Sequence, residues 1–191
     1  MVREIVIYGD AVLREKCVAV NEVTEEHREL SRDMLETMAA ANGIGLAAPQ
    51  IGVPIQLAVI DVSHDEECVN YLRIDGQERE LSDIMPLVFV NPRLKLGAET
   101  GVLEEGCLSF PEIRGEITRP SEVVAELGTL EGESLLIETD GLLGRAIQHE
   151  TDHLFGVLFI DRMSPARKLS LKKDIRAMRR DYGESFLPAG R

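Results

Sequence analysis

The sequence of 191 residues predicts one domain of the α+β class. Short β-rich runs occupy the middle of the chain and helical patterns flank them, without the regular strand and helix alternation of a parallel sheet. Apolar residues make up 44% of the chain and charged residues 29%, so the chain can bury a core and wholesale disorder is excluded. We expect short, mostly antiparallel strands around a central helix, with a further helix near the C-terminus.

The first predicted helix covers residues 24–41. Thr24, followed by two glutamates, is a favourable N-cap, and Asn42-Gly43 provides a stop. Apolar residues recur between them at helical spacing, at Leu30, Met34, Met38 and Ala41. The next segment, GIGLAAPQIG at 43–52, is too rich in Gly and Pro to continue the helix and too apolar for an exposed linker. We expect it to be buried and irregular.

Five β-rich runs separated by turn residues follow this segment. They cover residues 55–62, 87–91, 113–119, 122–127 and 134–138. The stretch between the first two runs, residues 63–83, is mostly polar and predicts a surface excursion.

A second helix is predicted from an N-cap at Thr139 or Asp140 to a stop near Gly156. Two adjacent stripes of this helix carry its apolar residues, Leu142, Leu143, Ala146, Ile147 and Leu154. The same stripes carry His149, Glu150 and His153, so three polar side chains lie on a face that packs into the core.

A third helix is predicted to begin at Ser164-Pro165, in the favoured order of N-cap and first-turn proline. Residues 166–180 contain seven Lys or Arg and one Asp, a net charge of about +6, whereas the whole chain carries −13. The overall charge opposes general attraction to nucleic-acid phosphate, and no specific binding to DNA is expected. The basic segment is either a solvated helix face or a docking surface for an anionic partner such as RNA.

The sequence predicts a cytoplasmic location without membrane attachment. No apolar run approaches the roughly 18 residues of a membrane span, and the first ten residues, MVREIVIYGD, lack an apolar stretch of signal-peptide length. Cys17, Cys68 and Cys107 cannot all pair within one chain, so a reducing compartment is expected.

The run QHETDHL at residues 148–154 contains an HExxH motif. His149 and His153 are four residues apart, which places both imidazoles on one side of the helix where they can bind one ion. Glu150, beside the first histidine, can accept a proton from metal-activated water. A chance match on an ordinary helix is the alternative, but polar groups on an apolar face need partners, and a metal ion supplies one.

A catalytic site of this kind needs a third protein ligand. Downstream, no histidine follows His153, Phe159 stands where a longer zinc-protease motif has its last histidine, and Glu184 is the remaining carboxylate candidate. Upstream, Cys107 lies in a Gly- and Ser-containing turn. Taken alone, Cys107 is better explained as a small buried apolar residue. Together with the two histidines it becomes the leading ligand candidate, because a thiolate and two imidazoles leave a fourth position for water.

Three sequence blocks resemble the peptide deformylases. GIGLAAPQ at 43–50, EGCLS at 105–109 and QHETDH at 148–153 occur in the order and approximate spacing of that family. The resemblance extends over roughly residues 1–170 through Leu13-Arg14, Arg119-Pro120 and the run from 140 to 162.

The resemblance implies that Cys107, His149 and His153 bind the metal and that Glu150 is the general base. It implies hydrolysis of the N-terminal formyl group of formyl-methionyl nascent polypeptides by metal-bound water, with release of formate. Residues 1–165 would form the catalytic part, and residues 166–191 a basic helix and tail of the same domain.

The resemblance also implies roles around the substrate. The Gln50 side-chain amide and the Leu108 backbone N–H would stabilise charge on the carbonyl oxygen. The peptide would lie along residues 43–46 as an added strand. Glu105 would orient its loop, and Arg114 would contact a peptide carbonyl or carboxylate, although either could form a surface ion pair instead. The pocket candidates are Ile44, Gly45 and Leu142.

The resemblance implies Fe²⁺ as the cofactor, with Ni²⁺, Co²⁺ or Zn²⁺ able to occupy the site in purified protein. It further implies a monomer of the bacterial cytoplasm that contacts the ribosome through residues 166–180. Two alternatives stay open: an HExxH peptidase that cleaves internal peptide bonds, and a metal-binding module without catalysis.

Overall fold

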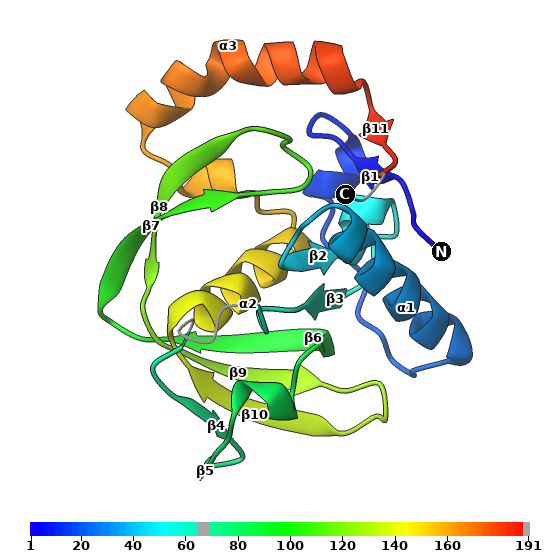
Figure 1. The fold of residues 1–191 in the computed structure, drawn as a ribbon, viewed down its shortest axis with the longest axis vertical. Coiled ribbons are helices and arrows are strands. Elements are labelled where there is room, and N and C mark those ends of the chain that lie inside the picture. The colour runs from blue at the N-terminus through cyan, green and yellow to red at the C-terminus, as the bar shows by residue number, and fades with distance from the viewer. Residues whose placement is uncertain (65–68, 189–191) are drawn as a thin grey trace.

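The structure is a computed structural model that describes residues 1–64 and 69–188 (Figure 1). It has the predicted α+β architecture, and every pairing between its named strands is antiparallel. The α-helices are α1 (Glu25–Ala40), α2 (Gly141–Leu154) and α3 (Pro165–Tyr182). No helix among the described residues is both long enough and apolar enough to span a membrane.

A seven-stranded sheet forms the largest layer. In spatial order its strands are β2 (Gly45–Ala47), β3 (Leu57–Ile60), β6 (Leu87–Leu96), β9 (Val123–Gly128), β10 (Ser134–Thr139), β4 (Leu72–Ile74) and β5 (Gln77–Glu78). Two further pairs are β7 (Thr100–Gly106) with β8 (Arg114–Pro120), and β1 (Ile5–Val6) with β11 (Ser185–Phe186). β2 therefore lies at one edge of the large sheet, a position that matters for the site.

Helix α2 lies in the middle of the molecule, between the large sheet and the β7–β8 pair (Figure 1). Its Leu143 and Ile147 are completely buried and belong to the same hydrophobic cluster as Phe89 and Ile137 of the sheet. Most other side chains of α2 are buried too, including polar ones. A helix enclosed in this way forces its histidines and acidic residues to find partners within the protein.

The α-helices begin directly after the residues predicted as their N-caps. Thr24 precedes α1, and the Ser164 side chain accepts a hydrogen bond from the Arg167 N–H at the start of α3. Asp140 does precede α2, but its carboxylate accepts hydrogen bonds from the backbone and side chain of Asn70, both at 2.8 Å. This side chain therefore attaches the segment before β4 to the start of α2 rather than capping the helix.

The predicted strands were incomplete, because β7 was not among them. The surface excursion predicted at residues 63–83 was wrong in part: β4 and β5 lie there, and they extend the large sheet because β4 pairs with β10 and β5 pairs with β4. Residues 65–68 of that stretch lie outside the described part. Within residues 43–52, positions 45–50 are buried as expected, but the segment forms β2 and a short 3₁₀ helix, Ala48–Ile51, instead of an irregular path.

Candidate metal centre

The structure brings Cys107, His149 and His153 together. One ligand atom from each lies within 4.8 Å of the others, and the Cys107 Sγ is 3.3 Å from the His153 Nε2. Cys107 immediately follows β7, whereas the histidines lie one turn apart on α2. One thiolate and two imidazoles are a donor set suited to a divalent transition metal.

Glu105 orients the first histidine. The Nδ1 of His149 lies 3.0 Å from the Glu105 Oε2, an N–H to carboxylate hydrogen bond that leaves Nε2 free to bind an ion. Glu105 also accepts hydrogen bonds from Arg119 and Arg145. Burial would raise the pKa of Glu105, but its bonds to His149 and Arg119 outweigh burial and hold that pKa far below its ordinary value. Glu105 is therefore an anion that fixes the ring of His149.

Glu150 lies next to the ligand cluster in a buried position. Its Oε2 has no hydrogen-bond partner among the described residues, and neither has the buried Nδ1 of His153. Burial raises the pKa of Glu150 to about 7, even though the nearby His149 and Arg119 favour its charged form. A buried carboxyl group with a free oxygen needs a further polar partner, and a metal ion with its water fits that requirement.

The two histidines differ in protonation when no ion is bound. Burial lowers the pKa of both rings, and for His153 the charge of His149 adds to this effect. For His149, hydrogen bonds with Cys107 and Glu105 outweigh burial and raise the pKa to about 10. A proton therefore competes with a metal ion for His149, because a ligating imidazole must be neutral.

Gln50 points its amide at the cysteine ligand. Its Oε1 accepts a hydrogen bond from the Ala47 N–H at 2.8 Å, and its Nε2 donates to the Ser109 Oγ at 3.3 Å and to the Cys107 Sγ at 3.5 Å. Leu108 follows Cys107 in the chain, and its side chain packs into the cluster formed by α1 and β3. The structure thus places both residues implied in charge stabilisation at the ligand cluster.

The remaining predicted residues fall into two groups. Ile44 and Leu142 are partly buried and pack against the same hydrophobic cluster, and a Cβ atom on Gly45 would overlap the Glu150 carboxylate. Leu142 lies on α2 itself, and Gly45 lies against Glu150 of that helix. Arg114 instead has an exposed side chain whose Nη1 lies 3.8 Å from the Glu104 Oε1, the surface ion pair named as its alternative.

Buried charges that the sequence did not predict lie behind the ligand cluster. Arg119, Arg145 and Asp152 are buried and bond to one another or to Glu105. A signal existed in the strand pattern, since Arg119 occupies the inward-facing register of β8 together with Ile117. A charged residue in an apolar register requires buried counter-charges, but the sequence does not say which.

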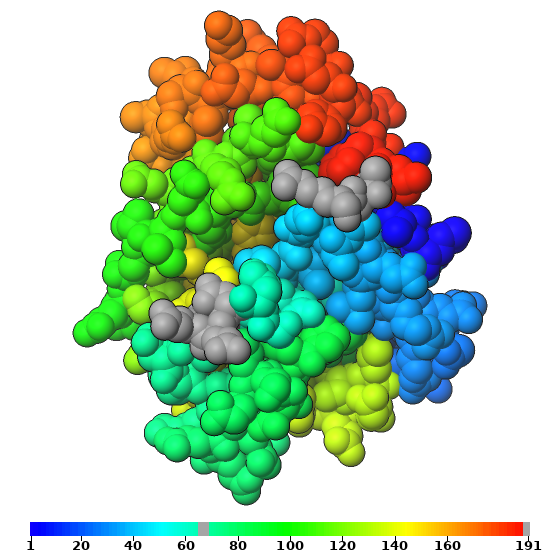
Figure 2. Space-filling view, in the orientation of Figure 1, coloured from blue at the N-terminus to red at the C-terminus, as the bar shows by residue number. Residues whose placement is uncertain are grey.

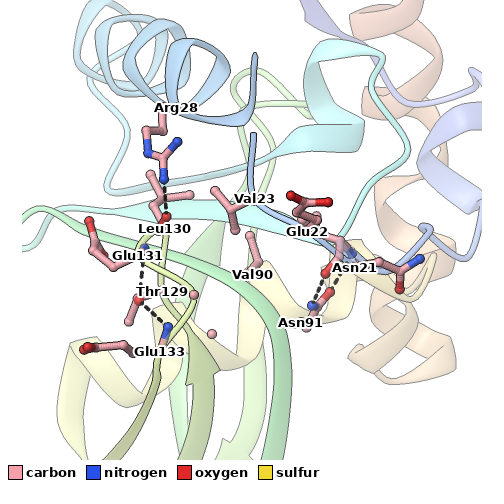
Figure 3. A pocket seen from close by; sticks show the side chains of 13 residues that line it. Asn21, Glu22, Val23, Arg28, Val90, Asn91, Thr129, Leu130, Glu131 and Glu133 are labelled. Atoms are coloured by element: carbon pink, nitrogen blue, oxygen red, sulfur yellow. Dashed lines mark hydrogen bonds between the residues drawn. The ribbon is translucent and has the colours of Figure 1, made fainter. Parts of the chain in front are cut away.

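A separate cavity of about 390 Å³ lies between the N-terminal end of α1 and the β9–β10 turn (Figure 3). Two of its polar side chains bond within its own walls: Arg28 donates to the Leu130 carbonyl at 2.9 Å, and the Asn91 side chain pairs with the backbone of Val20. Its described lining residues include no member of the ligand cluster, so we assign no chemistry to it.

Atoms of α2 reach the molecular surface on one face. Figure 2 shows them in yellow, between the green atoms of the β7–β8 region and the blue to cyan atoms that follow α1. The ligand-bearing helix is therefore visible between the strand before Cys107 and the segment that contains β2.

Comparisons with known proteins agree with this geometry. The polypeptide deformylase family model matches residues 2–169. A peptide deformylase of Opitutus terrae is 43% identical over 91% of this chain and 91% of its own, and one of Methylacidiphilum infernorum is 40% identical over 98% and 97%.

Solved structures give the same result. A peptide deformylase from Legionella pneumophila has a TM-score of 0.79 at 32% identity, covering 94% of this chain and 96% of its own. One from Thermotoga maritima has a TM-score of 0.74 at 37% identity, covering 86% and 99%. The chain belongs to the polypeptide deformylase family of metal-dependent hydrolases.

Proposed function

We propose that this protein hydrolyses the N-terminal formyl group of formyl-methionyl nascent polypeptides and releases formate. The observation that carries the proposal is the buried Glu150 carboxyl group, with one unpartnered oxygen, beside a Cys and two His donors. We propose Cys107, His149 and His153 as the metal ligands. A divalent ion held there would supply Lewis acidity and lower the pKa of a water molecule toward about 7.

Glu150 acts as the general base. It accepts the proton of the attacking water and passes a proton to the departing amine, so that formate and a free N-terminus result. One property of the residue supports this role: its Oε2 is buried beside the ligand cluster and has no hydrogen-bond partner among the described residues.

Gln50 and Leu108 stabilise the carbonyl oxygen as charge develops on it. The bond from the Ala47 N–H to the Gln50 Oε1 fixes which end of the amide faces the site, so the Nε2 donor points toward Cys107. A donor held in place before the reaction costs little reorganisation, and removing one such donor from other enzymes costs about 10²–10³ in rate.

The peptide binds along the free edge of β2. This strand pairs with β3 on one side only and lies at the end of the sheet order, so its other side can accept an added strand. Ile44, directly before β2, and Leu142, on α2, form the pocket for the methionine side chain.

Fe²⁺ is the proposed native metal. The family resemblance supports iron, and a thiolate with two imidazoles also accepts Ni²⁺, Co²⁺ or Zn²⁺. Activity is expected to be lost in air, because Fe²⁺ beside a thiolate ligand is oxygen-sensitive and a free Cys107 can oxidise further. The half-life of activity with and without oxygen measures this. Stable activity through prolonged aeration without reductant counts against iron.

The basic helix α3 is the proposed contact with the ribosome, for a monomeric enzyme in the bacterial cytoplasm. α3 forms one end of the molecule (Figure 2). Its buried Leu171 and Met178 pack with Ile7 and Leu13, which supports α3 as part of the same domain. Its Lys and Arg side chains are exposed: Arg167, Lys168, Lys172, Lys173, Arg176, Arg179 and Arg180.

Reversing exposed charges on α3 is expected to weaken ribosome binding while leaving turnover of a short peptide intact. Lys172→Glu combined with Lys173→Glu and Arg176→Glu removes cations that can pair with phosphate. Co-sedimentation with ribosomes at fixed salt measures the effect. Co-sedimentation equal to that of the wild type would refute the contact.

Gly45→Ala is expected to lower turnover by about 10²-fold, because a misplacement near 1 Å is enough for such a loss. The added methyl group would overlap the Glu150 carboxylate and lie 2.8 Å from its Cδ, so the base must move. Metal content should stay unchanged. Gly101→Ala, whose methyl group meets nothing closer than 3.4 Å, is the control. Equal rates for the two variants would contradict the placement of Glu150.

Substrate choice tests the proposal against a peptidase. We expect formate release from formyl-Met-Ala-Ser and no cleavage of casein by the same sample. Cleavage of casein with no formate release would establish an HExxH peptidase. Metal binding without turnover of either substrate would favour a module without catalysis.

A further inference from the structure

We propose that Arg119 is a positioning residue that holds the thiolate ligand and the two histidine ligands at the separation a metal ion requires. The inference rests on the proposed metal site and extends it to a residue of β8 that provides no ligand atom. Arg119 is 1% exposed and is among the largest completely buried side chains of the protein. A guanidinium buried this deeply persists only where carboxylates pair with it.

On one side Arg119 holds the strand that leads to the cysteine. Its Nε donates to the Glu105 Oε1 at 2.7 Å and its Nη2 donates to the Glu105 Oε2 at 3.0 Å. This two-point bond fixes the plane of the carboxylate. Glu105 stands two residues before Cys107 and also binds the Nδ1 of His149, so its position affects two of the three ligands.

On the other side Arg119 holds the helix that carries the histidines. Its Nη1 donates to the Asp152 Oδ2 at 2.8 Å, and Asp152 directly precedes His153 on α2. One rigid planar cation thus joins β7 to α2. Lysine cannot reproduce this connection, because its ammonium is a single point charge on a flexible stem.

Two neighbouring arginines each pair with one of the two carboxylates, and Arg145, which lies on α2, also links that helix to Glu105 of β7. Arg145 donates to Glu105 at 2.7 Å, and the Arg162 Nε donates to Asp152 at 2.6 Å. Among the arginines in the described ranges, Arg119 alone contacts both carboxylates. Loss of Arg119 therefore leaves each carboxylate paired, and leaves Arg145 and His149 bonded to Glu105, while it removes the side chain that holds Glu105 and Asp152 together.

Co²⁺ binding to the full-length protein tests the inference. Arg119→Met is expected to weaken Co²⁺ affinity about 10- to 100-fold, the range typical for partners behind metal ligands. The thiolate-to-cobalt absorption band should weaken as well, and Arg119→Lys should fall between Arg119→Met and the wild type. Affinity is measured by competition with a chelator, with thermal unfolding on the same samples. Arg93→Met, which removes an exposed ion pair with Glu126, should match the wild type.

Each outcome decides a different point. Wild-type affinity and spectrum in a folded Arg119→Met variant overturn the role of Arg119 and leave the metal site standing. A wild-type protein that takes up no Co²⁺ overturns both. If Arg119→Met does not fold, Asp152→Asn decides instead, because it weakens the Arg119 contact on the α2 side and leaves the bonds to Glu105 in place. Reduced Co²⁺ affinity in that variant supports the inference, and unchanged affinity overturns it.

Discussion

Replacing Glu150 with glutamine is expected to lower the rate of deformylation by about 10²–10⁴-fold, the contribution typical of a positioned general base. The glutamine amide has the shape of the glutamic acid side chain but cannot take a proton from water. Cys107, His149 and His153 remain in place, so the variant should bind as much metal as the wild type. The turnover number with formyl-Met-Ala-Ser and the metal content are measured on one sample.

The matched control is Glu29→Gln, at an exposed glutamate on α1. It should retain the full rate and the full metal content. A Glu150→Gln variant that kept more than half of the wild-type rate would refute its role as the base. A variant that lost metal in proportion to activity would make Glu150 a structural support of the ligands instead.

The same substitution changes the pH dependence of stability in the metal-free protein. Burial raises the folded-state pKa of Glu150 from its ordinary value of 4.5 to about 7. Its contribution to stability is therefore complete below pH 4.5 and is lost as the pH rises through 7. Glutamine has no such loss. In the metal-free proteins, the unfolding temperature of Glu150→Gln minus that of the wild type should be larger at pH 8 than at pH 4.5. A pH-independent difference would contradict the raised pKa.

Cys107→Ser is expected to weaken metal binding more than about 100-fold. Losing a residue that only hydrogen-bonds to a ligand typically costs about 10- to 100-fold, and Cys107 is a proposed ligand itself. A serine hydroxyl stays protonated near neutral pH, whereas the cysteine ligand is a thiolate. Activity should fall with metal content. Metal per chain after anaerobic purification measures the loss.

Cys17→Ala is the control for Cys107→Ser. Cys17 is buried in the main hydrophobic cluster, and burial raises the pKa of its thiol to about 11, which makes it inert. This variant should keep its metal even where it loses some stability. Full metal content in Cys107→Ser would remove the cysteine from the ligand set.

Local chemistry made part of this structure predictable. Thr24 and the Ser164-Pro165 pair mark helix starts through caps that need only neighbouring residues, and both helices begin where those caps predict. The HExxH spacing placed His149 and His153 on one face of α2 because helical geometry alone brings residues four apart together. The approach of Cys107 to that face depends on tertiary structure; the need for a third ligand made this thiol the leading candidate, and the resemblance to a family then supported it.

Other features depend on contacts that no local pattern encodes. β7 escaped prediction because most of its residues are exposed, so the chain shows no alternation of apolar and polar residues there. β4 and β5 are short and gain their place by pairing with β10. The bonds of Arg119 join residues 14 and 33 positions away in the chain, so they exist only once β7, β8 and α2 have packed together.

Formate release by anaerobically purified protein tests the central claim most directly. The substrate is formyl-Met-Ala-Ser, and metal analysis is carried out on the same sample. The account predicts one equivalent of formate for each free amine formed, at a rate that rises in proportion to the metal bound per chain. A protein with a full metal complement that releases no formate would contradict it.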